Sequence, residues 1–269
     1  PAFGILDYQS NNYQINCFRK INLALVNICE KYKEVNIVDI DFLQRFFGTE
    51  LVKDNRYWYI EKNPYSQKFL QLLAREYIKF IKALKGRVKK CLILDLDDTL
   101  WGGIIGEDGL NGIKIGNTYP GSAFKDFQRS ILNLYNRGII LGICSKNNIE
   151  DVKDVFENHP DMVLRLKHFS IIKVNWNDKA GNIRNISEEL NISLNNILYV
   201  DDNPFEINLV KTELPTVDVV QLPNDVTLYA DMSNSGPNSG TQLIAGVNFT
   251  IPAELSTLGL SHLDGITGQ

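Results

Sequence analysis

The chain has 269 residues, of which 44% are hydrophobic and 22% are charged, a composition that excludes global disorder and is typical of a folded globular protein. Its formal net charge of -4 gives no basic footprint for nucleic acid, and no apolar run approaches the length of a membrane span. The four cysteines form no C-x-x-C pair, which argues against a zinc site or a disulfide framework and predicts free thiols in a reducing compartment such as the cytoplasm.

The first third of the chain is expected to hold two helices, one strand and one loop. Apolar side chains at helical spacing predict helices over residues 13–32 and 66–84, and a β-branched run predicts a buried strand over 35–40. The aromatic and charged residues 53–63 are expected to form a loop. These elements are too few for a sheet of their own, so residues 1–85 are interpreted as the remaining half of an α/β domain.

From residue 88 onward, strands and helices are expected to alternate. Such alternation predicts right-handed crossovers and a doubly wound parallel sheet, so residues 86–229 are expected to form one α/β domain. Its ligands would bind beyond the carboxyl ends of the strands. Residues 230–269 have no coherent periodicity and are interpreted as a tail. Strands are expected at 91–96, 139–144, 171–176, 197–200 and 217–222, and helices at 121–137, 148–158, 179–190 and 204–213.

The strongest functional signal is the segment Asp95-Leu96-Asp97-Asp98-Thr99, at the carboxyl end of the first strand of this domain. Carboxylates crowded at a buried strand end cannot all ionise without a counter-ion, and a divalent cation removes that repulsion. Hard oxygen ligands of this kind suit Mg²⁺, which also binds a substrate phosphate. The alternative is an acidic turn or a helix cap.

Three further signals lie at the ends of later elements. Ser145 follows the second strand, and Lys179 begins a helix. Asp201-Asp202 follows the fourth strand, and Glu206 comes one helical turn later. Each has an ordinary alternative, because Ser and Asp commonly cap helices and most lysines are solvated. Their shared position at strand ends and helix starts, in this order, favours one site.

The order D-x-D-x-T, then S, K and D-D resembles the haloacid dehalogenase-like (HAD) superfamily of phosphotransferases. Longer motifs resemble its FkbH-like family, of the subfamily IIIC phosphatase type, over about residues 35–229. The resemblance implies a HAD-like Rossmannoid fold without a large cap, preceded in residues 1–85 by the C-terminal remnant of an SGNH-hydrolase-like domain. The motifs are LDLDDTLWGG from Leu94, GEDG from Gly106, CSKNN from Cys144, NWNDKA from Asn175 and VDDNPFE from Val200.

The chemistry of the catalytic residue types gives each an expected role. Asp95 is the expected nucleophile, which attacks phosphorus and forms an aspartyl-phosphate. Asp97 is the expected general acid, and then the base that activates water. Ser145 and Lys179 are expected to stabilise the phosphoryl oxygens.

The remaining site residues bind substrate or metal. Thr99 and Asn147 are expected to contact the substrate together with Ser145 and Lys179. Asp95, Asp202 and the backbone carbonyl of Asp97 are the expected Mg²⁺ ligands. Glu206 or Asp201 is expected to orient a metal-bound water.

Substrate access follows from the spacing of the motifs. About twenty residues, several of them glycines, separate Thr99 from the helix at Gly121, which suits a short β-hairpin flap over an open site.

The resemblance implies a phosphatase or glyceryl transferase that loads a glyceryl unit from 1,3-bisphosphoglycerate onto an acyl carrier protein, as in polyketide biosynthesis. Cys144 is the best-placed thiol for an acyl intermediate, although a strand cysteine is more often a small buried hydrophobe.

Two other interpretations remain open. The chain could be a non-catalytic module that docks a carrier protein, or a phosphatase of another pathway such as surface-glycan assembly. The complete set of acidic, hydroxyl and lysine residues disfavours the silent module. We expect a phosphorylated small-molecule substrate and an acyl carrier protein as partners, and neither nucleic acid nor membrane.

Overall fold

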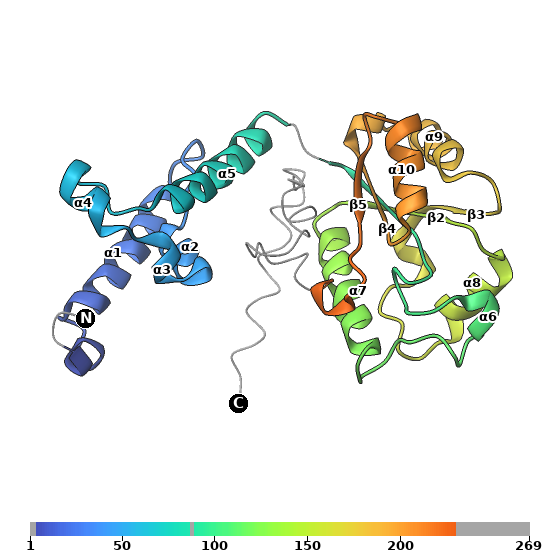
Figure 1. Ribbon diagram of the computed structural model, residues 1–269, viewed down its shortest axis with the longest axis horizontal. Helices are drawn as coiled ribbons and strands as arrows, with labels where there is room; N and C mark the ends of the chain where they lie inside the picture. Colours follow the sequence, from blue (N-terminus) through green and yellow to red (C-terminus); the bar gives the residue numbers. More distant parts are fainter. Residues whose placement is uncertain (1–3, 87–88, 230–269) are drawn as a thin grey trace. The chain divides into compact units, whose positions relative to one another are not determined.

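The computed structural model describes residues 4–86 and 89–229 of the chain (Figure 1). The chain divides into two compact units, Pro1–Phe80 and Ile81–Gln269. The tail expected at 230–269 lies outside the described residues. None of the helices within the described ranges combines the length and the apolar character needed to cross a membrane.

The first unit is helical in its described part. The prediction of a loop over residues 53–63 is wrong for most of that length, because the helix α4 (Asn55–Glu61) occupies it. Asp54 caps α4 by accepting a hydrogen bond from the Arg56 N–H at 3.0 Å. A small core gathers Leu43, Val52, Phe69 and Leu73. The elements are η1 (Gly4–Tyr8), α1 (Gln14–Cys29), α2 (Ile40–Phe47), α3 (Thr49–Val52), α4 (Asn55–Glu61) and most of α5 (Gln67–Leu84).

The strand expected at residues 35–40 is also wrong. Residues 35–39 form no regular element, and Val35 and Ile37 are 48% and 41% exposed. Asp39 instead caps α2 by accepting a hydrogen bond from the Phe42 N–H at 2.8 Å. The described part of this unit contains no strand, and a lone β-branched run has no neighbour to pair its backbone N–H and C=O groups. The assignment of residues 1–85 to an SGNH-like remnant stays a prediction.

The second unit is built on a parallel sheet of five strands in the order β3-β2-β1-β4-β5, which confirms the expected doubly wound α/β architecture. β1 lies at the centre of the sheet. Its Leu94 is in register with Ile143 of β2 and with Val200 of β4. The strands are β1 (Cys91–Leu94), β2 (Ile140–Ser145), β3 (Phe169–Val174), β4 (Ile197–Asp201) and β5 (Asp218–Gln221).

Helices cover both faces of this sheet (Figure 1). Leu92 and Leu94 of β1 share one core with α7 (Gly121–Asn136) and α8 (Ile149–Asn158). Cys91 and Ile93 share a second core with α9 (Lys179–Glu189) and α10 (Pro204–Glu213). The division follows from strand geometry, since successive side chains point to opposite faces. A strand buried on both faces is therefore a continuous apolar run, as in β1.

The topology fixes where a ligand can bind. The chain moves outward from β1 through β2 to β3 and then returns to place β4 on the other side of β1. The connections that leave β1 and β4 therefore diverge, and a crevice forms at the carboxyl ends of these two strands. Asp95 directly follows β1, and Asp202 directly follows β4.

The β-hairpin flap expected between Thr99 and Gly121 is not formed. Residues 95–120 are all described and contain the short helix α6 (Ile105–Asp108) and one antiparallel bridge, between Gly102 and Lys114. Each of these two residues donates its N–H to the carbonyl of the other, at 3.1 and 2.7 Å. Gly103, with φ of +95°, turns the chain away from a longer ladder and into α6.

Gly121, the first residue of α7, is expected to tolerate no side chain. A Cβ atom there would lie 2.6 Å from the Gly116 backbone N and 2.8 Å from the Ile115 carbonyl carbon. Gly121→Ala should therefore lower the free energy of unfolding by about 1–3 kcal/mol, because backbone atoms must shift. Gly106→Ala is the matched control, since its Cβ would have no atom within 4 Å and lies in a helix. Urea unfolding followed by circular dichroism measures both, and equal midpoints would contradict this account.

Candidate active site

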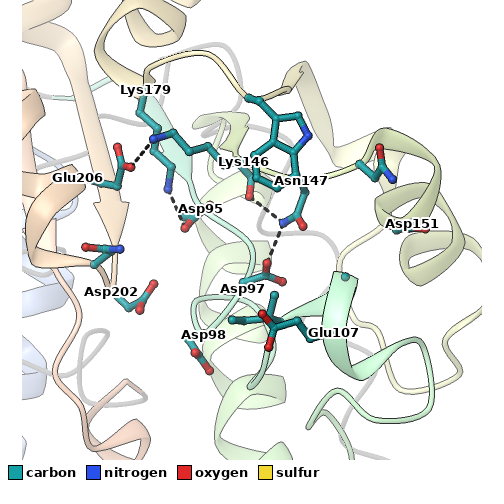
Figure 2. Close-up of a pocket in the computed structure, with 16 residues that line it drawn as sticks. Asp95, Asp97, Asp98, Glu107, Lys146, Asn147, Asp151, Lys179, Asp202 and Glu206 are labelled. Atoms are coloured by element: carbon teal, nitrogen blue, oxygen red, sulfur yellow. Dashed lines mark hydrogen bonds and ion pairs between the residues drawn. The ribbon is translucent and has the colours of Figure 1, made fainter.

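A cleft of about 610 Å³ lies at the carboxyl ends of the central strands (Figure 2). Its walls come from the segments that follow β1, β2, β3 and β4, and from α6. The topology therefore brings together residues from four separate parts of the sequence. Six of the seven residues expected in the catalytic, substrate and metal sets line this cleft: Asp95, Asp97, Ser145, Asn147, Lys179 and Asp202.

Thr99, the seventh residue, does not line the cleft. It is fully buried, and its hydroxyl has no hydrogen-bond partner among the described residues. Asp98 adopts a positive φ of 47°, and the Leu100 N–H donates to the Leu96 carbonyl at 2.7 Å. This turn carries Thr99 back into the core, so the structure does not support the expected contact between Thr99 and the substrate.

A buried charge cluster lies at the base of the cleft. Lys179 Nζ is 2.8 Å from Asp95 Oδ2 and 2.6 Å from Asp201 Oδ2. Asp95, Lys179 and Asp201 are 7%, 3% and 0% exposed. The Tyr199 hydroxyl also donates to Asp201 Oδ2, and the Asn203 N–H donates to Asp201 Oδ1 at 2.8 Å. Both oxygens of Asp201 are thus occupied, and its carboxylate holds Lys179 beside Asp95.

Burial and neighbouring charges shift the pKa values of this cluster. Burial raises the pKa of Asp95 to about 6, although the Lys179 charge opposes the shift. Burial lowers the pKa of Lys179, but Asp95 and Asp201 outweigh it and raise that pKa above its usual range, so the ammonium stays charged. Burial, reinforced by Asp201 and Asp95, raises the pKa of Asp202 to about 7. The single positive charge of Lys179 therefore does not neutralise the negative charge of the three carboxylates.

The same carboxylates could hold a divalent cation. Asp95, Asp201 and Asp202 each offer an oxygen, and these atoms lie within 4.8 Å of one another. Asp95 Oδ1 is buried and accepts no hydrogen bond from the described residues. Carboxylates at this spacing repel one another, and their hard oxygen atoms are the ligands that divalent cations such as Mg²⁺ prefer. Because both oxygens of Asp201 already accept hydrogen bonds, the geometry favours Asp95 and Asp202 as the side-chain ligands.

The Asp97 carboxylate lies outside this group and is oriented separately (Figure 2). Its Oδ1 accepts hydrogen bonds from Trp101 Nε1 at 2.9 Å and from the Ile105 N–H at 3.1 Å. Its Oδ2 accepts from Asn147 Nδ2 at 2.9 Å, and the same amide donates to Ser145 Oγ at 3.1 Å. The side chain of Asp97 is therefore held toward α6 and the segment after β2, and it is not part of the acidic cluster of Asp95, Asp201 and Asp202.

Cys144 is also placed away from the cleft. It is fully buried in the core with α9 and α10, and burial raises the pKa of its thiol to about 12. A reactive cysteine needs access and a lowered pKa. The structure therefore supports the alternative of a small buried hydrophobe.

Two site features were missed in the sequence. Tyr199, inside an apolar strand, donates to Asp201. The spacing of two residues puts both side chains on one face of β4, which is a signal that could have found this contact. Lys146 Nζ lies 2.6 Å from Glu206 Oε1, and no local signal links these two distant residues. Asp201 and Glu206, expected to orient a metal-bound water, are thus each paired with a lysine.

The comparisons with known proteins found similar solved structures. No family model matches the sequence, and no curated protein matches it. Among solved structures, the N-terminal part of the protein BF1531 from Bacteroides fragilis, which contains a phosphatase domain and was crystallised with Mg, is 35% identical to the chain with a TM-score of 0.79. The match covers 88% of this chain and 61% of that one, so the chain spans about three fifths of the BF1531 structure.

HAD proteins are among the more distant matches. A HAD family enzyme from Bacteroides thetaiotaomicron, crystallised with magnesium and inorganic phosphate, is 10% identical over 50% of this chain and 94% of its own, with a TM-score of 0.35. The HAD domain of the effector Lem4 from Legionella pneumophila is 16% identical over 56% and 96%, with a TM-score of 0.38. At this distance they carry no argument about the site. The α/β fold class that the HAD resemblance implies is confirmed by the five-stranded parallel sheet and the BF1531 match.

Removing the Lys179 charge should destabilise the second unit. Lys179→Met leaves two buried carboxylates, Asp95 and Asp201, without their counter-charge, and should lower the free energy of unfolding by about 3–5 kcal/mol. Lys153→Met is the control, because Lys153 and Glu150 form a solvent-exposed pair on α8 at 3.1 Å, and such pairs contribute about 0–1 kcal/mol. Denaturant unfolding measures both, and equal losses would contradict the stabilising role of Lys179.

Proposed function

We propose that the chain is a Mg²⁺-dependent phosphatase or phosphotransferase of the HAD type, acting on a phosphorylated small molecule through an aspartyl-phosphate on Asp95. One observation carries the proposal. The Asp95 carboxylate lies at the topological switch point, with Oδ2 paired to the buried Lys179 and Oδ1 accepting no hydrogen bond from the described residues. The phosphatase domain and the Mg of the BF1531 structure support the same chemistry here.

Asp95 and Lys179 form the centre of the proposed reaction. The Lys179 charge favours the ionised form of Asp95 against the effect of burial. An Asp95 carboxylate oxygen attacks phosphorus, the bond from phosphorus to the leaving oxygen breaks, and the phosphoryl group is transferred to Asp95. Lys179 and the Ser145 hydroxyl then stabilise the negative charge that develops on the phosphoryl oxygens.

Asp97 moves the protons in this scheme. Hydrogen bonds from Trp101, Ile105 and Asn147 orient its carboxyl group in the cleft. Asp97 gives a proton to the leaving oxygen and then takes one from the water that attacks the aspartyl-phosphate. The two transfers restore its starting protonation state, so that one water is consumed and one phosphate is released.

Asp95 and Asp202, with the Asp97 backbone carbonyl, would hold Mg²⁺. When bound, the ion would neutralise negative charge shared by the nucleophile and the phosphoryl group. The cluster has more carboxylates than lysines, and burial together with the neighbouring carboxylates raises the pKa of Asp202 to about 7. A bound cation would supply the missing positive charge. Asp201 acts indirectly in this proposal, because it holds Lys179 in place.

The finer proposal is an FkbH-type glyceryl transferase that loads a glyceryl unit from 1,3-bisphosphoglycerate onto an acyl carrier protein. The five sequence motifs support it, and a cleft of about 610 Å³ has room for more than a phosphate.

A phosphatase of another pathway, such as surface-glycan assembly, is the alternative. A non-catalytic docking module is disfavoured, because docking needs no buried carboxylate paired with a lysine. Incubation with 1,3-bisphosphoglycerate and an acyl carrier protein, read by intact-protein mass, tests the transfer.

Substitution should separate the roles of the two aspartates. Asp95→Asn removes the nucleophile and should abolish the phosphoenzyme. Asp97→Asn keeps the nucleophile but loses the proton transfer, which should slow ester hydrolysis by about 10²- to 10⁴-fold. Acetyl phosphate has a good leaving group and needs little acid assistance, so it should still phosphorylate Asp97→Asn and the phosphoenzyme should accumulate. Hydroxylamine-sensitive label on each variant measures this, and equal labelling of the two would contradict the assignment.

Magnesium binding should weaken as the pH falls. With pKa values of about 7 and 6 in the cluster, Asp202 and Asp95 hold protons below neutral pH that Mg²⁺ must displace. The affinity should therefore fall between about pH 8.5 and about pH 5.5, and binding near pH 6.5 should release protons. Titration calorimetry in buffers of different ionisation enthalpy measures both quantities, and Asp202→Asn should bind Mg²⁺ more weakly at every pH because it loses a proposed ligand. An unchanged affinity, or full turnover in excess EDTA, would contradict the proposal.

A further inference from the structure

The segment between β3 and α9 places a large aromatic side chain at the rim of the cleft. Trp176 is 73% exposed and lines the cleft, whereas Trp101 is fully buried. An exposed indole leaves apolar surface in water that burial would stabilise, so packing within the described residues does not account for its position. The other large apolar side chain in the lining is Ile104, which is 42% exposed.

Hydrogen bonds fix the backbone on both sides of Trp176. The Asn175 N–H donates to the Ser145 carbonyl at 3.1 Å. The side chains of Asn175 and Asn182 exchange two hydrogen bonds, at 2.9 and 3.2 Å. The Asn177 N–H donates to Asn175 Oδ1 at 3.0 Å. Trp176 therefore stands on a well-anchored turn.

The same turn shares its supports with the proposed phosphoryl site. Its contact with Ser145 connects it to the end of β2. Asp178 Oδ1 accepts a hydrogen bond from the Gly181 N–H at 2.6 Å and caps α9, whose first residue is Lys179. The backbone that carries Trp176 is thus held at a fixed position relative to Ser145 and Lys179. A tryptophan side chain on such a backbone has only two rotatable side-chain bonds, so it loses little conformational entropy when it binds a ligand.

We propose that Trp176 determines substrate specificity by stacking on a planar, apolar group in the leaving-group part of the substrate. The inference rests on the phosphatase part of the proposed function, which places the phosphoryl group at Asp95 and Lys179. It favours a phosphatase of another pathway over glyceryl transfer, because the leaving group of 1,3-bisphosphoglycerate is polar. A leaving group that extends from there toward solvent reaches the rim of the cleft, where Trp176 and Ile104 supply apolar surface among charged and amide side chains. Aromatic rings bind planar partners by offset stacking or edge-to-face contact.

The test compares two phosphate esters, 2-naphthyl phosphate and glycerol 2-phosphate, in the presence of Mg²⁺. The ratio of their kcat/KM values is measured for the wild type and for Trp176→Ala, because comparing ratios cancels the difference in leaving-group reactivity. The ratio should fall about tenfold in Trp176→Ala, mainly through KM for the naphthyl ester, and Trp176→Phe should keep most of it. Phe205→Ala is the matched control, since Phe205 is 69% exposed but does not line the cleft.

Two results would overturn the inference: an unchanged ratio in Trp176→Ala, which would favour a contact with a partner protein instead, or an equal fall in Phe205→Ala. Failure of the proposed function has a different signature, because the wild type would then hydrolyse neither ester. Calorimetric binding of the two esters to Asp95→Asn, with and without Trp176→Ala, tests stacking without turnover, because this variant lacks the proposed nucleophile. An affinity for 2-naphthyl phosphate that does not change with Trp176→Ala would overturn the inference in that case too.

Discussion

The ion pairs of Lys179 with Asp95 and Asp201 are the interaction on which the rest of the site depends. The fold places carboxylates at the carboxyl ends of two adjacent strands, β1 and β4, where they repel one another in a buried setting. A lysine from the start of α9 offsets part of that repulsion. Because one lysine neutralises only part of the negative charge, the cluster of Asp95, Asp201 and Asp202 keeps an excess that a divalent cation can neutralise. The stability of the unit and its proposed chemistry thus depend on the same charges.

The hydrophobic core positions the second aspartate. Trp101 is fully buried and packs edge-on against Phe156, with ring centroids 6.0 Å apart, while its indole N–H donates to Asp97. The short segment that carries Gly102 and α6 is fixed by a backbone bridge to Lys114. The side chain proposed to move protons is therefore held by core packing and by loop hydrogen bonds. A substitution in this core that moves Trp101 should therefore also change the orientation of the Asp97 carboxylate in the cleft.

Local patterns failed where the answer depended on a partner elsewhere in the chain. The β-branched residues 35–40 have strand propensity, yet no strand is described beside them and α2 begins at Ile40. Thr99 belongs to the acidic motif, but the turn at Asp98 carries it into the core. For Cys144, by contrast, the more common expectation of a small buried hydrophobe agrees with the structure, because the alternation of side chains along β2 turns this residue into the core with α9 and α10. The residue types at these positions are visible in the sequence, but the tertiary structure decides where each side chain points.

The sequence by itself determined the alternating elements of the second unit, because apolar periodicity and buried strand runs are local properties of the chain. It also determined which residues stand at strand ends, and in parallel strands those ends meet at one edge of the sheet. Only the tertiary structure decided which charges pair there, how Asp97 is oriented and which residues form the rim. Two contacts join positions that are far apart in the chain: the Lys146–Glu206 ion pair and the backbone hydrogen bond from Asn175, beside Trp176, to Ser145. Local patterns do not encode such contacts, because they form only when separate elements, here the segments after β2 and β3 and the helix α10, are brought together.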